Sequence, residues 1–430
     1  MNLIFKIQMN HLKNCGRIGR SGLTGGLTGG LISGLVLVFG CESPPPDLTP
    51  TVVSEDPTDI PLPGVSPALR QQFLAGDAAF DAVFLDGDGL GPNYIRTSCG
   101  SCHAGAGKGP GSVQKMALVQ ADGVTPSGDQ SALLFGNTVR PYYAGGAQTG
   151  LLPPSSNPQL KLSLRVGLPV FGRGYLEAIE DREIERVESE QSQRTDEIHG
   201  RINRVVFQSQ PNSDKSYHQY QAGQSGLIGR FGHKARIATL DDFSADAAQG
   251  DMSITSPLRP SELPNPDGKL DDRKPGPDID LQTINRLADY MRLLAIPHRT
   301  EASIAGPKLF AEALCSVCHV PSLKTRSSYP IPELAGKDAP VFTDLLLHDM
   351  GVALADGLTD GMATSRQWRT APLMGLRFFQ SYLHDGRGKT IEEAILLHHG
   401  TGSEASGSVA KFRALSASDR QELIRYVSSL

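Results

Sequence analysis

The chain has 430 residues, 39% of them hydrophobic, and a formal net charge of −5 at pH 7. This length is sufficient for two or three domains with hydrophobic cores. The small net charge, without a run of Lys and Arg interleaved with aromatic residues beyond the N-terminus, excludes an electrostatic argument for nucleic acid as a partner. Function must therefore be inferred from the motifs.

The N-terminus has the pattern of an export signal. Four basic residues precede an uncharged stretch, 21–40, whose most apolar part is 31–39. This apolar part is too short and too rich in Gly for a stable membrane-spanning helix, so residues 1–40 are predicted to be a signal peptide. Cys41 follows Val-Phe-Gly, which resembles a bacterial lipobox, although Phe39 is unusual there. We expect a lipid anchor at Cys41 and a periplasm-facing location in the cell envelope, with a soluble secreted form as the alternative.

Residues 41–67 are rich in Pro and poor in large apolar residues, which predicts an extended tether. The next stretch, 68–84, carries apolar residues at helical spacing and is predicted to be a helix. Paired Asp and Gly residues at 86–92 then predict a turn. A calcium loop would have the same start, but the bidentate Glu expected at its end is missing.

The sequence Cys99-Gly-Ser-Cys102-His103 follows, and Cys315-Ser-Val-Cys318-His319 repeats its spacing. In Cys-x-x-Cys-His, two thiols add to the vinyl groups of a haem and the His binds the iron. Zinc binding or a redox Cys pair is the alternative. Against zinc, the two pairs lie far apart in the chain and each has its His directly after the second Cys. Covalent attachment also leaves no free thiol in these pairs for thiol oxidoreduction.

The rest of the chain contains three clear helical signals and one region without them. Residues 201–280 are rich in Gly, Pro and polar residues and are predicted to be loops and short elements. Apolar residues at helical spacing predict a helix from Leu281 that ends before Pro297, and a shorter helix over 307–314 precedes the second motif. Ser418-x-x-Gln421 resembles a capping box at the start of a last helix.

From residue 68 to 430 the chain resembles the bacterial di-haem oxidoreductase, putative peroxidase family, which is related to di-haem cytochrome c peroxidases and the MauG enzyme. The matching segments are 86–92, 171–179, 230–232, 343–351, 368–370 and 383–387. The resemblance implies a mainly α protein with two cytochrome c-like haem domains, 68–200 and 281–430, around the loop-rich insertion 201–280. Two positions depart from the family pattern: His233 replaces a usual Trp, and Ala371 replaces a usual Pro.

The resemblance also suggests ligands for the second haem. Related peroxidases place a Met or Tyr ligand 14 residues after the His of a His-Asp-Gly motif, and counting from His384 leads to His398. A helix predicted over 389–397 could aim this side chain inward. We therefore expect His319 and His398 to bind the second iron, with Met350 as the alternative to His398. Without the spacing, His398 would be read as a helix-ending residue favoured by the dipole.

The first haem, bound by His103, has no comparable second ligand in the sequence, which is consistent with an open site. Peroxide cleavage needs a group that transfers a proton, and Glu177 is the candidate because it occupies a family-typical position. A surface Glu at a helix start is the alternative. The residues Arg165, Arg369 and Arg387 could pair haem propionates. Trp368 could lie between the haems, although core packing also explains a single Trp.

The expected function is that of a di-haem oxidoreductase with two covalent c-type haems. A small redox protein would donate electrons to the C-terminal haem, which would pass them to an N-terminal haem that reacts with hydrogen peroxide or a related oxidant. One alternative is an electron carrier without chemistry of its own, and another is an accessory to iron uptake in the envelope. Family analogy adds a calcium ion between the haem domains, without assignable ligands.

Overall fold

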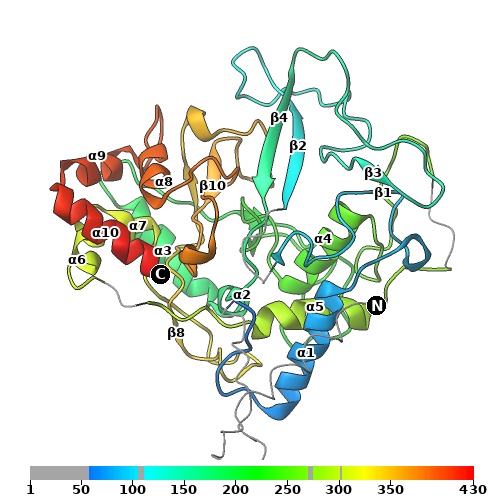
Figure 1. Cartoon of the computed structure of the whole chain (residues 1–430), viewed down its shortest axis with the longest axis horizontal. Helices are drawn as coiled ribbons and strands as arrows, with labels where there is room; N and C mark the ends of the chain where they lie inside the picture. Colours follow the sequence, from blue (N-terminus) through cyan, green and yellow to red (C-terminus); the bar gives the residue numbers. More distant parts are fainter. Residues whose placement is uncertain (1–57, 105–110, 270–274, 301–302) are drawn as a thin grey trace, which may run out of the picture. The chain divides into compact units, whose positions relative to one another are not determined.

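The computed structural model describes residues 58–104, 111–269, 275–300 and 303–430 (Figure 1). The predicted signal peptide, Cys41 and the tether up to residue 57 lie outside the described residues. None of the helices in the described ranges combines the length and the apolar character that a membrane crossing requires.

Helices are the main regular structure of the described residues, in agreement with the helix-rich prediction. They are α1 (Pro67–Asp81), α2 (Arg173–Ala178), α3 (Asp181–Ser192), α4 (Leu240–Met252), α5 (Leu281–Leu293), α6 (Gly306–Glu312), α7 (Cys315–Cys318), α8 (Ile391–Leu397), α9 (Ser406–Ala414) and α10 (Ala417–Ser429). Three short 3-10 helices are η1 (Asp86–Asp88), η3 (Val352–Leu354) and η4 (Leu376–Phe378). The division into two cytochrome c-like domains stays a prediction.

The strands of the described residues pair two by two and antiparallel. The pairs are β1 (Asn93–Tyr94) with β3 (Tyr142–Tyr143), β2 (Ser112–Leu118) with β4 (Leu160–Val166), β5 (Arg204–Val205) with β6 (Leu227–Ile228), β7 (Leu323–Lys324) with β8 (Asp338–Ala339), and β9 (Leu347–Asp349) with β10 (Gln367–Arg369). The longest ladder runs from the Ser112–Val166 pair to the Leu118–Leu160 pair. Figure 1 shows it as a ribbon beside the helices.

The helix expected at 68–84 is α1, and it packs on α5. Ser66 caps α1 by accepting a hydrogen bond from the backbone N–H of Leu69, and Pro67 occupies the first turn, where no donor is lost. The two axes come close because position 76 is Gly: a Cβ there would lie 2.5 Å from the carbonyl oxygen of Arg286. The apolar pattern that predicted α5 is also confirmed, since Ile284 and Leu287 are buried.

The last part of the predicted tether is folded onto α5 instead of extending from it. Leu62 is 2% exposed, and its N–H donates to the carbonyl of Leu293 over 2.7 Å. The carbonyl of Ile60 accepts a hydrogen bond from Ala295. Residues 58–66 therefore form a short edge against the end of α5, because Leu62, with the partly buried Ile60 and Val65, gives this Pro-rich segment apolar surface to bury.

The expectation of only loops and short elements over 201–280 was wrong in one respect, because it missed α4. Thr239 caps this 13-residue helix, which packs on α5. Its buried residues include Leu240, Ala245 and Ala248, which belong to the largest apolar cluster of the described residues. Ala and Asp fill much of α4, so its hydrophobic periodicity is weak in the sequence.

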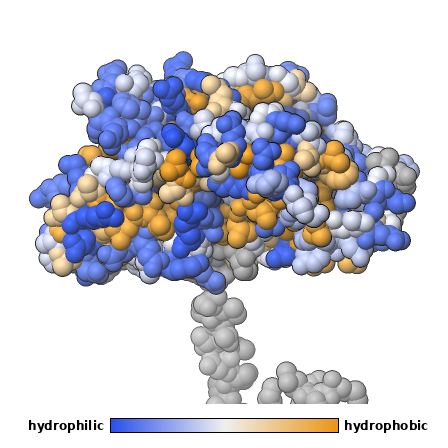
Figure 2. Space-filling model, turned by 90° about the horizontal axis from the view of Figure 1, so that it is seen from above, coloured by the Kyte–Doolittle hydropathy of each residue, from blue (hydrophilic) through white to orange (hydrophobic). Residues whose placement is uncertain are grey.

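A second apolar cluster gathers α6, α8, α9 and α10 near the C-terminus (Figure 1). It includes Phe310, Ile391, Phe412 and Leu423. The predicted capping box is wrong by two residues: Ser416 caps α10 and accepts a hydrogen bond from the N–H of Asp419. Outside the clusters, hydrophobic and hydrophilic residues are interspersed on the face seen in Figure 2.

Candidate functional site: two pockets at the Cys-x-x-Cys-His motifs

Each Cys-x-x-Cys-His motif forms a tight turn at the edge of its own pocket. In the second motif, α7 ends with the N–H of His319 donating to the carbonyl of Cys315 over 2.9 Å. In the first, the N–H of His103 donates to the carbonyl of Cys99 over 3.0 Å. In the second motif both Cys residues and His319 line one pocket, and in the first motif Cys102 and His103 do so. All four thiols are free, and the two pairs do not meet in one site, which disfavours a shared zinc.

The pocket at the second motif, called the C-terminal pocket, is largely apolar. Its walls come from α6, α8, α9, α10 and the segment before η4, and they include Phe310, Leu373, Ile391, Ile395, Val409, Leu423 and Val427. The apolar cluster of these helices supports the same walls. A planar macrocycle with apolar faces would replace water against such walls at a favourable free energy.

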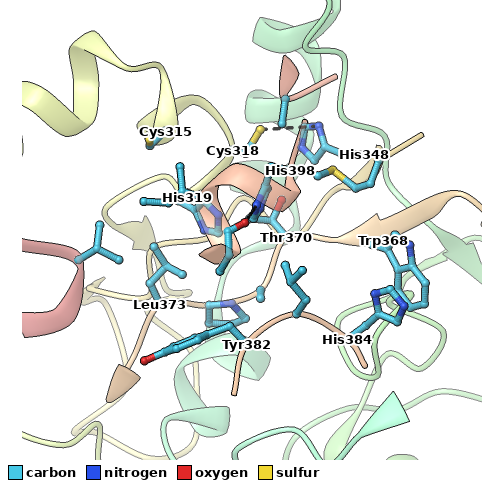
Figure 3. A pocket seen from close by; sticks show the side chains of 18 of the residues that line it. Cys315, Cys318, His319, His348, Trp368, Thr370, Leu373, Tyr382, His384 and His398 are labelled. Atoms are coloured by element: carbon cyan, nitrogen blue, oxygen red, sulfur yellow. Dashed lines mark hydrogen bonds between the residues drawn. The ribbon is translucent and has the colours of Figure 1, made fainter. Parts of the chain in front are cut away.

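Two imidazoles with matching orientation face the C-terminal pocket (Figure 3). Nδ1 of His319 donates to the carbonyl of Phe342 over 3.2 Å, and Nδ1 of His398 donates to the carbonyl of Ala394 over 2.6 Å. Because a carbonyl only accepts, each Nδ1 carries the hydrogen and each Nε2 keeps its lone pair. Burial lowers the pKa of His319 to about 4 and also lowers the pKa of His398, so both rings are neutral, as iron ligands must be.

The structure thus brings both residues of the predicted ligand pair to one pocket. Thr390 caps α8 and starts the helix that delivers His398 at its C-terminal end. Met350 lines the same pocket, so the alternative ligand is also present. Of these two candidates, His398 has a hydrogen bond at its other ring nitrogen that orients the ligand atom, which is the arrangement typical of metal-binding His.

The pocket at the first motif, called the N-terminal pocket, is richer in polar and charged side chains than the C-terminal pocket. Charged side chains of Lys115, Arg165, Arg236, Asp246, Asp251, Arg259 and Asp360 line it together with Cys102 and His103. Backbone approaches the motif closely: a Cβ on Gly111 would lie 2.6 Å from Sγ of Cys102, and one on Gly167 would lie 3.2 Å from Cε1 of His103. Backbone atoms of Gly111 and Gly167, and not side chains, therefore lie against the motif at these two places.

His103 resembles a neutral iron ligand, but its Nδ1 lacks the hydrogen bond that His319 and His398 make. Burial lowers the pKa of His103 to about 4, and its Nδ1 is buried without a hydrogen bond. A buried polar atom without a partner is costly and unusual in a folded protein. The C-terminal pocket offers two thiols and two neutral imidazoles. The N-terminal pocket is lined by Cys102 and His103, while Cys99 packs against the main apolar cluster. Both motifs therefore supply donor types that fit a c-type haem. Covalent haem in each pocket stays a prediction.

Most of the charges in the N-terminal pocket are paired with each other. Asp246 forms ion pairs with Arg236 and Arg259, and Asp360 pairs with Arg165 at 2.9 Å. Asp251, near the end of α4, forms no ion pair with any described residue. Burial raises the pKa of Asp251 to about 6. Among these carboxyl groups, Asp251 is therefore the one available to exchange a proton near neutral pH.

Glu177, the predicted proton-transfer group, lines neither pocket. Its carboxylate accepts hydrogen bonds from Nε of Arg292 at 2.7 Å, the hydroxyl of Tyr329 at 2.7 Å and the N–H of Leu240 at 2.8 Å. Burial would raise the pKa of Glu177, but the charge of Arg292 outweighs it and the pKa lies below the ordinary value. These contacts describe a buried ion pair that joins α2, α4 and α5, so the geometry does not favour the catalytic role, which stays a prediction.

The two pockets share a wall made of Leu168, Pro169, Arg173 and His233. His233, the departure from the family pattern, donates from Nε2 to the carbonyl of Val166 over 2.9 Å and meets the ring of Trp368 edge-on. Trp368 lies on the C-terminal side, with His384 stacked on it at 3.7 Å between ring centroids (Figure 3). The single Trp is thus both a core residue and a neighbour of the shared wall.

His348 connects the second motif to its surroundings. Its Nδ1 lies 2.7 Å from Glu404, its Nε2 lies 2.9 Å from Asp344, and Sγ of Cys318 lies 3.7 Å from Nδ1. Two carboxylates facing the two nitrogens require a hydrogen on each, so the ring is an imidazolium. Cys318, Asp344 and His348 form the one metal-ligand cluster found among the described residues. With both nitrogens used, His348 acts as a support of the motif turn.

Of the three Arg residues expected near propionates, two are already paired. Arg165 binds Asp356 at 2.6 Å as well as Asp360, and the half-exposed Arg387 binds Asp385 at 2.6 Å. Arg369 is buried and lines the C-terminal pocket. Sequence reasoning could not single out Arg369, because the partners of Arg165 lie 191 and 195 residues away in the chain, although Asp385 is only two residues from Arg387.

Sequence reasoning missed Arg173 and Asp251. Arg173 lies in the segment 171–179 that carried part of the resemblance, but the family pattern gave no reason to single it out. Asp251 lies in α4, whose start was signalled by Thr239-x-x-Asp242, a cap pattern that could have been found.

Comparison with known proteins agrees with the motifs. The model of the family described as "Di-haem oxidoreductase, putative peroxidase" matches residues 155–430, so the chain belongs to this family. The match contains the second motif and begins after the first, whereas the resemblance was expected from residue 68. Family membership implies two haems and an oxidoreductase.

Other comparisons add little. No curated protein matches the chain. A chain of hydrazine synthase from Kuenenia stuttgartiensis, solved under 20 bar of xenon, matches with 14% identity and a TM-score of 0.37, and the match covers 96% of this chain and 100% of that one. A similarity at this TM-score carries no argument about this protein.

Proposed function

We propose that the protein is a peroxidase-type oxidoreductase of the bacterial cell envelope with two covalent c-type haems. Electrons from a small redox protein enter at the haem of the C-terminal pocket and pass to the haem of the N-terminal pocket, where hydrogen peroxide or a related oxidant is reduced. The overall reaction consumes one peroxide, two electrons and two protons and yields two waters. When bound, the haems supply the electron storage and the site of peroxide reduction.

The observation that carries this proposal is the difference between the two His environments. In the C-terminal pocket, His319 and His398 both offer an oriented Nε2, and two side-chain ligands leave no position for a substrate. In the N-terminal pocket, His103 stands in a polar cavity. An iron with one protein ligand and polar surroundings suits a small polar oxidant, and the apolar pocket suits electron storage.

The chain's own residues provide for the protons of the reaction. Asp251 lines the N-terminal pocket and its pKa of about 6 lets it accept and return a proton near neutral pH. Lys115 lines the same pocket, and burial lowers its pKa to about 8. We assign the proton transfer to Asp251, because the geometry leaves Glu177 outside the pocket.

Electrons must cross the wall that the pockets share. Trp368, with His384 stacked on it and His233 at its edge, provides aromatic contact from the C-terminal pocket to this wall. The envelope location rests on the predicted signal and on Cys41 as membrane anchor. Both features lie outside the described residues.

A second function, that of an electron carrier without chemistry, has one observation in its favour. Besides His103, the side chains of His233 and Met291 line the N-terminal pocket and carry atoms that can bind iron. A bond from either side chain to the iron would leave no coordination position for a substrate. Against this, Nε2 of His233 is used by Val166, and Met291 belongs to the main apolar cluster.

Visible and EPR spectra of the purified holoprotein test the proposal. We expect two haems, one low-spin and six-coordinate and the other high-spin, with carbon monoxide binding to the reduced protein and peroxide consumption that depends on an added reductant. If both haems are low-spin, carbon monoxide does not bind and peroxide is not consumed, the protein is a carrier and the enzyme proposal fails.

A further inference from the structure

Two buried guanidinium groups near the shared wall lack a negatively charged partner. Arg173 and Arg369 are each 5% exposed. Nε of Arg173 donates to the carbonyl of Pro169 over 2.6 Å, and Nε of Arg369 donates to the carbonyl of Gly232 over 3.0 Å. One terminal nitrogen of each, Nη2 of Arg173 and Nη1 of Arg369, is buried without a hydrogen bond. Neither group has an ion pair with any residue that the structure describes.

Other buried Arg residues show what is missing here. Arg292 binds Glu177 at 2.7 Å, Arg165 binds Asp356 at 2.6 Å, and Arg230 binds Asp181. A buried charge without a partner loses its hydration without compensation, so proteins normally pair it. Arg173 and Arg369 depart from this rule together, and the charge of Arg369 is unfavourable for that of Arg173. A third buried Arg without an ion pair to a described residue, Arg140, lines neither pocket and donates to the hydroxyl of Ser253 and the carbonyl of Phe135 instead.

The positions of Arg173 and Arg369 indicate where a negatively charged partner would lie. Arg173 lines both pockets, and Arg369 lines the C-terminal pocket. Burial holds the pKa of Arg173 well below its ordinary value, and burial lowers the pKa of Arg369 to about 10, so each loses solvation without compensation. The terminal N–H groups of a guanidinium match the two oxygens of a carboxylate. The site is therefore built for a carboxylate between the pockets.

We propose that Arg173 and Arg369 form an anion site in the wall between the pockets that binds haem propionates, with Arg173 contacting a propionate from each haem. This inference rests on the haem placement proposed above. It assigns a positioning role to the two residues: they orient the macrocycles and place positive charge next to both. A free carboxylate from solution would satisfy the same groups, so the experiment must separate the two sources.

The test measures the reduction potentials of both haems in the holoprotein and in Arg173→Gln, Arg369→Gln and Arg173→Lys. Arg230→Gln is the matched control, since Arg230 is a buried Arg that lines neither pocket. Haem content and melting temperature are measured on the same samples. A positive charge favours the reduced state of a nearby haem, because reduction adds an electron.

We expect Arg173→Gln to lower both potentials and Arg369→Gln to lower chiefly that of the C-terminal haem. In Arg173→Lys both potentials should fall less than in Arg173→Gln, because a positive charge is kept. Arg230→Gln should lower the melting temperature without a shift in either potential. Equal potentials in Arg173→Gln and in the wild type overturn the proposal. If Arg173→Gln does not fold, the Arg369→Gln and Arg173→Lys measurements decide in the same way.

Titration of the wild type with sodium acetate separates the two sources of carboxylate. If propionates occupy the site, acetate leaves both potentials unchanged. A shift that saturates with acetate and disappears in Arg173→Gln would show a free anion at the site and would overturn the propionate assignment. A protein without covalent haem would instead contradict the proposed function, and the haem content reveals this separately.

Discussion

The two pockets carry the same five-residue motif and differ in almost everything around it. Apolar side chains of four helices enclose the C-terminal pocket, and a second imidazole faces His319 there. Charged side chains from β2, β4, α4 and the loops line the N-terminal pocket, and His103 has no equivalent of His398. The motif thus fixes how a haem is held, whereas the surroundings determine what its iron can do.

Helices dominate the walls of the C-terminal pocket, whereas strands, loops and α4 share the walls of the N-terminal pocket. Helix α10 packs on α6 and α8, and the apolar cluster of α6, α8, α9 and α10 gives the C-terminal pocket walls with few polar groups, which suits the electron storage proposed for it. Loops and short strands leave room for polar groups, as a site that handles protons requires. The assignment of storage and chemistry to the two pockets is therefore open to test on each side.

Removal of one Cys pair should have the largest effect. We expect the double variant Cys315→Ala with Cys318→Ala to lose the covalent haem of the C-terminal pocket completely and to keep the other. The matched variant Cys99→Ala with Cys102→Ala should lose the other haem. Mass spectrometry of the intact chains counts the attached haems. Two haems in either double variant would contradict the assignment of one haem to each motif.

Replacement of His398 should abolish the difference in iron coordination between the pockets. In His398→Ala the low-spin signal should change to high-spin, because the second ligand is gone, whereas Met350→Ala should keep it. EPR spectra of the two variants, with haem content as control, decide between the ligands. A low-spin signal that survives in His398→Ala and is lost in Met350→Ala would make Met350 the ligand.

Asp251→Asn tests the chemistry of the N-terminal pocket. We expect peroxide turnover to fall by about 10²-fold, the usual contribution of a positioned acid–base group. The wild-type rate should decrease as the pH falls through about 6, since burial raises the pKa of Asp251 to that value and only the carboxylate can accept a proton. The variant should lose this dependence. Steady-state rates between pH 5 and pH 8 (about one unit below to two above that pKa) measure both effects, and an unchanged profile in Asp251→Asn would exclude the role.

Glu177→Gln should have the smallest effect on function and a clear effect on stability. The variant leaves Arg292 as a buried charge with a weakened partner, which costs about 3–5 kcal/mol when a buried pair is broken. Denaturant unfolding measures the loss, and the spectra of both haems should remain those of the wild type. A normal unfolding free energy together with a lost peroxide activity would restore Glu177 as the catalytic residue.

Two features of this structure followed from local patterns, since the spacing of apolar residues predicted α1 and α5. The family resemblance, through its spacing from His384, led to His398, which does line the pocket of His319. Such predictions succeed when the signal lies within a few helical turns. The miss at α4 has the same cause, because a helix rich in Ala and Asp carries little periodic signal.

By itself, the sequence determined that the chain holds two Cys-x-x-Cys-His motifs, that it is rich in helix, and that it belongs with di-haem oxidoreductases. Only the tertiary structure decided which charges remain unpaired. Glu177 and Arg165 form ion pairs with residues 115 and 191 positions away, Arg292 and Asp356, whereas Arg173 and Asp251 form no ion pair with a described residue. Pairing of buried charges depends on distances between segments remote in the chain, and no local pattern records those distances.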